Sequence, residues 1–380
     1  MSTYKYSFPT LIHFGPGVRH QVAAHLKAAG FKRPLVVTDK GVADLGFFKE
    51  FISELKEGQL DAAAFSGIWG NPVKSQVTAG VQAFAAHQAD SIVGIGGGAA
   101  LDVAKAIALM IKHPGDLFDY EDEKPGARAI DQEVPYWVAL PTTSGTGSEV
   151  GRSAVISDDQ THIKKIIFSP KLLAKAVFAD PELSYDLPAK VTAATGMDAL
   201  THCVEAYLAK GFHPICDGIA LEGLRLAAKS LAKAVKNPRD ATARGEMMMS
   251  SMMGAIAFQK GLGITHSCAH ALGTVTDMHH GLANAVIINT ALKFNIPAVP
   301  ERFTIMAQTV GLKDTSPESF IRWLEELKRE IGIPARLSEL GVKKEQLPAL
   351  LKVATEDGCH PNNPRVCTAE TFQGVFTEAL

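Results

Sequence analysis

The sequence predicts an α/β domain with a doubly wound, mostly parallel sheet, followed by an all-α domain. Short apolar runs alternate with helical stretches in the first half, and helical spacing rich in Ala, Leu and Met dominates the second half. The length of 380 residues suits two domains. We expect them at 1–187 and 188–380, because Pro188 breaks the chain just before a helical stretch.

Three apolar runs have the length and character of buried parallel strands. Residues 34–39 (PLVVTD) precede a helical stretch at 44–58, residues 91–96 (SIVGIG) run into a helix that continues through Ile111, and residues 136–140 (YWVAL) end at a proline. Parallel strands are usually covered on both faces, so they form continuous apolar runs. The order of strand, turn and helix therefore predicts a doubly wound sheet with a Rossmann-like arrangement.

Long helical segments make up the second half, at 200–236, 241–259 and 316–331. Apolar residues recur there at intervals of three and four, without the alternation of a strand. We therefore expect the second domain to be all-α.

Composition and charge exclude several classes of protein. With 38 Lys and Arg against 40 Asp and Glu, the net charge of -2 does not suit binding of nucleic acid through a basic surface. The most apolar stretch, 91–111, carries Asp102 and Lys105, which a bilayer would penalise. The N-terminus lacks the pattern of a secretory signal, and the five cysteines form no CxxC pair. We expect a cytoplasmic protein without nucleic-acid or membrane partners.

Three glycines, Gly96 to Gly98, stand where a predicted strand ends and a helix begins. Glycines there let the backbone approach a pyrophosphate, and the N–H groups and dipole of the helix start favour its negative charge. The spacing is not GxGxxG, the usual dinucleotide fingerprint. Taken alone, the triplet is equally well explained as a tight turn without a ligand.

Two further loops follow predicted strands. Asp39 ends the first strand, where a carboxylate can accept hydrogen bonds from a ribose and repel a 2′-phosphate, although capping a helix is the commoner role. Residues 141–149 (PTTSGTGSE) supply hydroxyls and glycines suited to wrapping ribose and phosphate. Open α/β sheets bind ligands at the carboxyl ends of their strands, so the three loops together predict an NAD site.

Asp198 and His202 stand four residues apart, on one face of a predicted helix. His266 and His270 repeat this spacing, and His280 adds another imidazole. Each histidine alone is more often a surface or core residue, but the combination predicts a metal site. The Irving–Williams order leaves the choice between Fe²⁺ and Zn²⁺ open. A Lewis acid together with a dinucleotide predicts an oxidoreductase for alcohols or aldehydes.

Together these motifs resemble the iron-dependent, group III alcohol dehydrogenase family, which has a dehydroquinate synthase-like fold. The similarity runs from FGPG at 14–17 through VVTD, GGGAALDVAKA, PTTSGTGSEV, GMDALTHCVEAY, GITHSCAHALG and HHGLANA to NNPR at 362–365. It implies Fe²⁺, with Zn²⁺ as the alternative, and NAD-linked oxidation of a primary alcohol or diol, or reduction of the aldehyde. It also implies a homodimer or higher homo-oligomer, with the active site in the cleft between the two domains.

The resemblance also implies the roles of individual residues. Four of them match the family's metal ligands: Asp198, His202, His266 and His280. His270 is then a catalytic residue that is not a ligand, beside the nicotinamide, where it positions substrate or relays the alcohol proton. The implied cofactor contacts are Asp39, Asn71, Gly97, Gly98, Ala99, Asp102, Thr142, Thr143, Thr146, Lys164 and Leu183. Ala99 departs from the family pattern, which often has serine there, so one side-chain hydrogen bond to phosphate is missing.

Three alternatives remain at this point. Arg152 follows the hydroxyl-rich loop and could recognise an anionic hydroxy compound such as 4-hydroxybutyrate or a sulfonated alcohol, although pairing with a surface carboxylate is the commoner role. A lyase of the dehydroquinate synthase type also uses NAD and a metal, but the sequence around the metal motifs has almost none of the Lys and Arg that its polyanionic substrate requires. A third interpretation is a protein that binds metal or nucleotide without turnover.

Overall fold

The computed structural model describes residues 6–8, 10–122 and 124–380, which form two compact units. The first unit contains the described residues up to Thr143 together with Ser148–Leu183. The second contains Ser184–Leu380 and the short segment Ser144–Gly147. The middle of the hydroxyl-rich loop therefore packs with the second unit; the hydroxyl of Ser251, for example, donates to the carbonyl of Gly145 at 3.0 Å.

A six-stranded parallel sheet forms the centre of the first unit, in the order β1-β8-β5-β4-β2-β3. The strands are β1 (Leu11–Phe14), β2 (Pro34–Asp39), β3 (Ala63–Ile68), β4 (Ser91–Gly96), β5 (Trp137–Pro141) and β8 (Ala176–Ala179). The three strands expected from the sequence, β2, β4 and β5, are confirmed and lie side by side within the sheet. They are buried along almost their whole length, which explains their continuous apolar runs.

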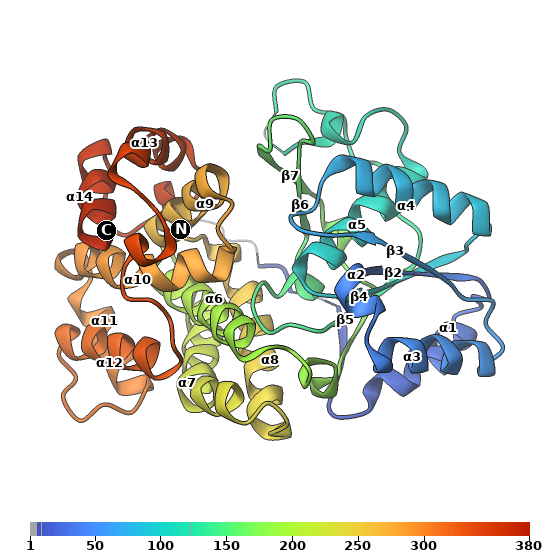
Figure 1. Ribbon diagram of the computed structural model, residues 1–380, viewed down its shortest axis with the longest axis horizontal. Coiled ribbons are helices and arrows are strands. Elements are labelled where there is room, and N and C mark those ends of the chain that lie inside the picture. The colour runs from blue at the N-terminus through green and yellow to red at the C-terminus, as the bar shows by residue number, and fades with distance from the viewer. Residues whose placement is uncertain (1–5, 9, 123) are drawn as a thin grey trace. The chain divides into compact units, whose positions relative to one another are not determined.

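Helices cover both faces of this sheet (Figure 1), as a doubly wound fold requires. They are α1 (Val22–Ala28) and α3 (Gly46–Glu57) on one face, and α4 (Lys74–His87) and α5 (Gly98–Lys112) on the other. Val36, Val93 and Val138, from three adjacent strands, share one core cluster with the apolar residues of α1 and α3. The strand neighbours of these residues point to the opposite face, because side chains alternate along a strand.

An antiparallel ribbon is an addition that the sequence reasoning did not anticipate. It pairs β6 (Ser153–Ser157) with β7 (Lys164–Phe168), in the register Ser153 to Phe168 and Ser157 to Lys164. Its two short strands are only partly buried, so they lack the continuous apolar run of the central strands.

The second unit is helical, as expected. Its α-helices are α6 (Ala189–Leu208), α7 (Pro214–Lys236), α8 (Ala241–Ala257), α9 (Ile264–Thr276), α10 (His280–Asn295), α11 (Pro300–Thr309), α12 (Pro317–Glu330), α13 (Leu347–Glu356) and α14 (Ala369–Ala379). Helix α6 is buried from Thr192 to Leu208 and packs against α7, α8 and α10. Among the described residues, no helix combines the length and the apolar character needed to span a membrane.

Candidate active site

Three loops meet at the carboxyl edge of the parallel sheet. Strand β4 pairs with β2, although β3 lies between them in the sequence. Strand β3 is added on one side of β2 and β4 on the other, so the strand order reverses at this position. Such switch points are where open α/β sheets bind ligands. A Cβ built on Gly96, at the end of β4, would lie 3.2 Å from Oδ2 of Asp39, at the end of β2. One built on Gly97 would lie 3.3 Å from Cγ2 of Thr143, in the loop after β5.

The turn from β4 into α5 requires glycine. Gly96 has a φ of 151°, and a Cβ there would lie 2.6 Å from that of Ala100. Gly97 is the N-cap of α5, and no capping side chain accepts a hydrogen bond from the first-turn N–H groups of this helix. The first turn, which contains Gly98 and Ala99, therefore offers N–H groups and a positive helix end to a phosphate.

Asp39 caps a helix in this structure. Its Oδ1 accepts a hydrogen bond from the N–H of Val42 at 2.9 Å, at the start of the short helix α2 (Lys40–Ala43). Its Oδ2 faces Gly96. A carboxylate accepts several hydrogen bonds, so a cap and a ribose contact are compatible. The ribose contact stays a prediction.

Asp102 joins three elements of the first unit. Its Oδ1 accepts from the hydroxyl of Ser148 at 2.6 Å and lies 3.4 Å from the buried ammonium of Lys105. Its Oδ2 accepts from the N–H of Val155 at 3.0 Å. Both oxygens are thus engaged within the protein, and the side chain ties α5 to β6 and to the loop before it. A direct contact between Asp102 and the nucleotide stays a prediction.

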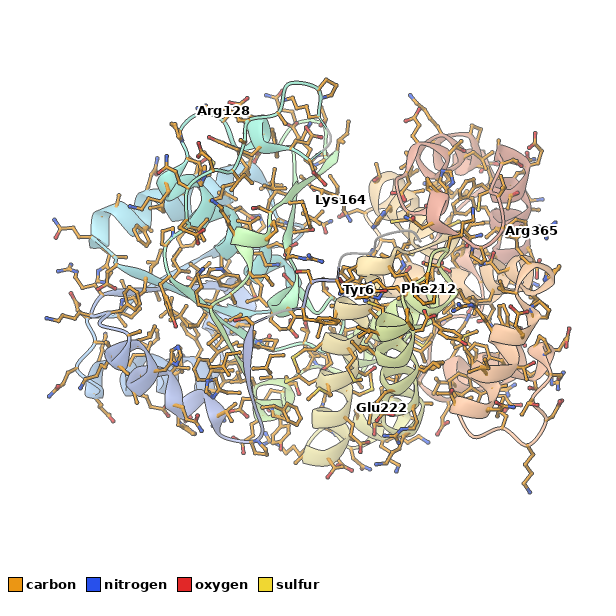
Figure 2. All side chains as sticks on the ribbon, turned by 180° about the vertical axis from the view of Figure 1, so that it is seen from behind. Tyr6, Arg128, Lys164, Phe212, Glu222 and Arg365 are labelled. Atoms are coloured by element: carbon orange, nitrogen blue, oxygen red, sulfur yellow. The ribbon has the colours of Figure 1, made fainter. Side chains whose placement is uncertain are left out.

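The remaining expected cofactor residues lie on several elements. Asn71 follows β3, and Thr142 follows β5. Lys164 is the first residue of β7, in the antiparallel ribbon, and is labelled in Figure 2. Leu183 is buried in the core of the first unit. Thr146 belongs instead to the loop segment that packs with the second unit.

Asp198, His202, His266 and His280 lie together in the second unit, with one ligand atom of each within 4.8 Å of the others. Oδ1 of Asp198 lies 3.9 Å from Nε2 of His202 and 3.5 Å from Nε2 of His280. The ring centroid of His266 lies 4.7 Å from that of His202. Three imidazoles and one carboxylate around a common point form a donor set that suits a divalent transition metal.

Three helices supply these side chains. Asp198 and His202 lie one turn apart on α6, His266 lies in the first turn of α9, and His280 is the first residue of α10. The glycine after His280 lets α10 approach α6 closely, because a Cβ on Gly281 would lie 2.3 Å from a backbone oxygen of α6. This close approach brings His280 next to Asp198.

Burial and charge set the protonation of the cluster. Burial by itself opposes ionisation of Asp198. The facing imidazoles of His202, His280 and His266 outweigh burial and lower the pKa of Asp198 to about 2. Burial lowers the pKa of His202 to about 4, against the attraction of Asp198. At neutral pH the carboxylate is therefore charged and His202 is neutral, and these are the forms that bind metals.

Asn284, one turn after His280 on α10, was not anticipated from the sequence. Its Nδ2 donates to Oδ1 of Asp198 at 2.8 Å and lies 3.4 Å from Nε2 of His266 and 3.2 Å from Nε2 of His280. Three electron-rich atoms thus converge on one donor group. A cation would satisfy the same three atoms, so the cluster fits a metal ion.

His270 lies beside the cluster on α9. Its ring stacks on that of His280, with centroids 5.3 Å apart, and its Nδ1 donates to Oδ2 of Asp357 at 2.7 Å. The hydroxyl of Ser267 and the N–H of Cys359 donate to the other oxygen of Asp357. The structure thus gives His270 a carboxylate partner, Asp357, that is not one of the four expected ligands. Asp357 was also missed by the sequence reasoning, because it lies 87 residues from His270.

Arg152 lies between the hydroxyl-rich loop and β6. The carbon at the centre of its guanidinium lies 5.6 Å from the centroid of the Phe168 ring. Over the described parts of the chain, no carboxylate lies within 4.0 Å of the charged nitrogens of Arg152. The commoner role considered for it, pairing with a surface carboxylate, is therefore not seen among these residues.

Family profiles match almost the whole chain. The profile described as "Iron-containing alcohol dehydrogenase" matches residues 9–181. The profile described as "Fe-containing alcohol dehydrogenase family, C-terminal" matches residues 192–380.

Individual proteins are similar over the same length. The chain is 37% identical to an NAD-dependent methanol dehydrogenase of Bacillus methanolicus over 373 residues, which cover 96% of this chain and 97% of the relative. It is 36% identical to a 4-hydroxybutyrate dehydrogenase of Cupriavidus necator, over 98% of both chains. The crystal structure of a 1,3-propanediol oxidoreductase superposes with a TM-score of 0.94 at 36% identity, over 100% of both chains.

Proposed function

This chain belongs to the iron-containing alcohol dehydrogenase family, and we propose that it interconverts small primary alcohols or diols and their aldehydes with NAD and a divalent metal. The proposed metal is Fe²⁺, with Zn²⁺ as the alternative. The proposed ligands are Asp198, His202, His266 and His280. The observation that carries the proposal is the convergence of these four side chains, from three helices, with one ligand atom of each within 4.8 Å of the others.

Two features support NAD as the cofactor. The turn at Gly96 and Gly97 opens a helix whose first N–H groups suit a pyrophosphate. The carboxylate of Asp39 lies beside this turn, where it would accept hydrogen bonds from an unmodified ribose and repel a 2′-phosphate. The relative from Bacillus methanolicus is named as NAD-dependent.

When bound, the metal supplies Lewis acidity toward the alcohol oxygen, and NAD supplies the acceptor for the hydride. Asp198 and the three histidines provide a charged carboxylate and imidazole nitrogens to hold the ion. His270 donates from Nδ1 to Asp357, which leaves Nε2 to accept the alcohol proton or to return it in the reverse direction. The reaction requires the nicotinamide to reach the metal, so we propose that both domains, 1–187 and 188–380, supply residues to the active site.

One experiment tests metal, cofactor and reaction together. The metal-free protein is reconstituted anaerobically with Fe²⁺, Zn²⁺ or Mn²⁺ and assayed with short alcohols, diols and aldehydes, using NAD(H) and NADP(H). We expect steady NADH production from a primary alcohol or diol, fastest with Fe²⁺. Binding of NAD and metal without turnover of any alcohol or aldehyde would overturn the proposal. Steady NADH production would exclude a lyase of the dehydroquinate synthase type, which uses NAD only transiently.

A second candidate substrate class is an anionic hydroxy compound such as 4-hydroxybutyrate or a sulfonated alcohol. It is favoured by Arg152, a cation whose observed partner is the Phe168 ring. One of the relatives is named for 4-hydroxybutyrate.

We also propose a cytoplasmic homodimer or higher homo-oligomer. All five cysteines are free thiols, which suits a reducing compartment. Strand β1 is an edge strand of the sheet, and its Leu11 and Phe14 are 58% and 43% exposed. An edge strand with exposed apolar side chains suits pairing with a second copy of the chain.

A further inference from the structure

Glu205 is a buried carboxylate within the GMDALTHCVEAY motif that has no role in the proposed ligand set. It lies on α6, three residues after His202, and is 2% exposed. Its side chain accepts four hydrogen bonds, all from the start of α9. The donors are the N–H groups of Gly263 (3.1 Å), Thr265 (2.7 Å) and His266 (3.2 Å), and Nδ1 of His266 (2.7 Å).

These bonds satisfy N–H groups at the buried start of α9. The first N–H groups of a helix have no partner within it, and the N-cap of α9 is Gly263, which has no side chain to supply one. Glu205 supplies most of the acceptors, and Oδ1 of Asn363 accepts from Ile264 at 3.3 Å. A carboxylate is also favoured there by the positive end of the helix dipole.

Glycine at the N-cap is what lets these acceptors approach. A Cβ on Gly263 would lie 2.9 Å from Oε1 of Glu205 and 2.8 Å from Oδ1 of Asn363. The position of the α9 backbone at His266 is therefore set by Glu205 and by a glycine that makes room for it.

The same carboxylate determines which nitrogen of His266 carries a proton. An ionised carboxylate only accepts hydrogen bonds, so Nδ1 of His266, 2.7 Å away, must donate. In the neutral imidazole, Nε2 then keeps its lone pair. This nitrogen lies 3.4 Å from Nδ2 of Asn284, on the side where the proposed ligands converge. Carboxylates that hold the second nitrogen of a metal-binding histidine fix its tautomer and orientation in this way.

We propose that Glu205 is a positioning residue for the metal centre: it fixes both the backbone and the tautomer of His266 without touching metal or substrate. The proposal rests on the metal site of the proposed function and adds a determinant of metal affinity to it. One side chain sets both the cap of α9 and the tautomer of His266. A substitution of Glu205 should therefore weaken metal binding more than its effect on the stability of α9 accounts for.

The test is Glu205→Gln in the full-length, metal-free protein. Glutamine keeps the size of the side chain, but its NH₂ group cannot accept from Nδ1 of His266 or from the backbone N–H groups. Where the amide faces Nδ1, it favours the tautomer that carries its proton on Nε2. We expect the Kd for Co²⁺, followed by visible absorption and chelator competition, to rise about 10- to 100-fold. Histidine ¹⁵N spectra without metal should show Nε2 of His266 unprotonated in the wild type and protonated in the variant.

Two matched controls separate positioning from stability. Asn363→Ala removes a cap from the same helix and breaks the buried pair with Asn295, without touching His266. It should lower Tm and leave the Co²⁺ Kd within about threefold of the wild type. Glu222→Gln removes one carboxylate from the surface of α7 (Figure 2), where it pairs with Arg225, and should change neither quantity.

The outcomes distinguish this proposal from the proposed function. Failure of the wild type to bind Co²⁺ would overturn the metal site itself, and this inference with it. If the wild type binds Co²⁺ and Glu205→Gln has the same Kd, only the positioning role is overturned. The positioning role is also overturned if Asn363→Ala weakens Co²⁺ binding to the extent expected from its lower Tm, because loss of stability would then explain both variants. If Glu205→Gln does not fold, Glu205→Asp replaces it. The shorter carboxylate should weaken Co²⁺ binding while Nε2 of His266 stays unprotonated, and a wild-type Kd in this variant would contradict the proposal.

Discussion

Nδ1 of His270 lies 2.7 Å from Oδ2 of Asp357, and this hydrogen bond joins α9 to the residue that ends α13. Asp357 is largely buried, which by itself opposes its ionisation, but the hydrogen bond from His270 and those from Ser267 and Cys359 hold its pKa below the usual range. The carboxylate therefore stays charged and accepts from Nδ1. Nε2 is the nitrogen left for the substrate.

Replacing His270 should separate proton transfer from metal binding. His270→Ala should keep the metal and lower kcat by about 10²- to 10⁴-fold, the usual contribution of a positioned acid or base. His266→Ala, the comparison variant, should lose metal and activity together. Metal content by elemental analysis and steady-state rates check both. Loss of metal from His270→Ala would mean that His270 is a metal ligand and that His266 is the proton relay.

Replacing Asp357 should act on kcat through His270. Asp357→Asn removes the charge that holds the proton on Nδ1, and a wrong tautomer of a catalytic histidine costs up to about 10⁴-fold in kcat. We expect a loss of at least about tenfold, with metal content unchanged. If kcat stays at the wild-type value in this variant while His270→Ala is impaired, the orienting role is wrong.

The buried cluster should make the metal-free protein sensitive to acid. The pKa of His202 is about 4 in the folded chain, against 6.5 for an unperturbed histidine, so between these values only the unfolded chain binds the proton. Stability is therefore lost as pH falls from about 6.5 to about 4, by on the order of 3 kcal/mol from this residue. Urea unfolding of the metal-free protein across this range measures it. His202→Gln should flatten the dependence, and an equally steep curve in this variant would contradict the assignment.

Replacing Asp39 should alter the choice between NAD and NADP. Asp39→Asn keeps an oxygen that can accept from Val42 and so preserves the cap of α2, while it removes the charge that would repel a 2′-phosphate. We expect the preference for NAD, as the ratio of kcat/KM values, to fall at least about tenfold with Tm nearly unchanged, since one charge repulsion of about 1.4 kcal/mol corresponds to tenfold. Asp39→Gly also loses the side-chain cap and should have a lower Tm. If the ratio of kcat/KM values for NAD and NADP is unchanged in both variants, the prediction that Asp39 contacts the ribose is wrong.

The second substrate class is tested at Arg152. If the guanidinium recognises an anionic tail, Arg152→Ala should raise KM for succinic semialdehyde about tenfold or more, the scale of one lost charged hydrogen bond, and leave KM for propanal nearly unchanged. Arg152→Lys should recover part of the loss, because it keeps the charge. Equal changes for both aldehydes would exclude anion recognition at this position.

The sequence by itself determined the class of fold and the location of the main motifs. Strands β2, β4 and β5 were predictable because each is covered on both faces and so forms an unbroken apolar run. Strand β1, at the edge of the sheet, and the β6–β7 ribbon are partly exposed, and their local sequence carries no comparable signal. The spacing of Asp198 and His202 follows from helix geometry alone, because residues four apart share a face.

Only the tertiary structure decided what each polar side chain contacts. His266 and His270 have the same helical spacing, yet His266 faces the cluster with Nδ1 held by Glu205, whereas His270 pairs with Asp357. These partners lie 61 and 87 residues away in the chain. A hydrogen bond depends on distances of a few tenths of an ångström between separate helices, and periodicity within one helix carries no information about them. The roles of Glu205, Asn284 and Asp357 therefore emerged only once α6, α9, α10 and the segment after α13 were packed together.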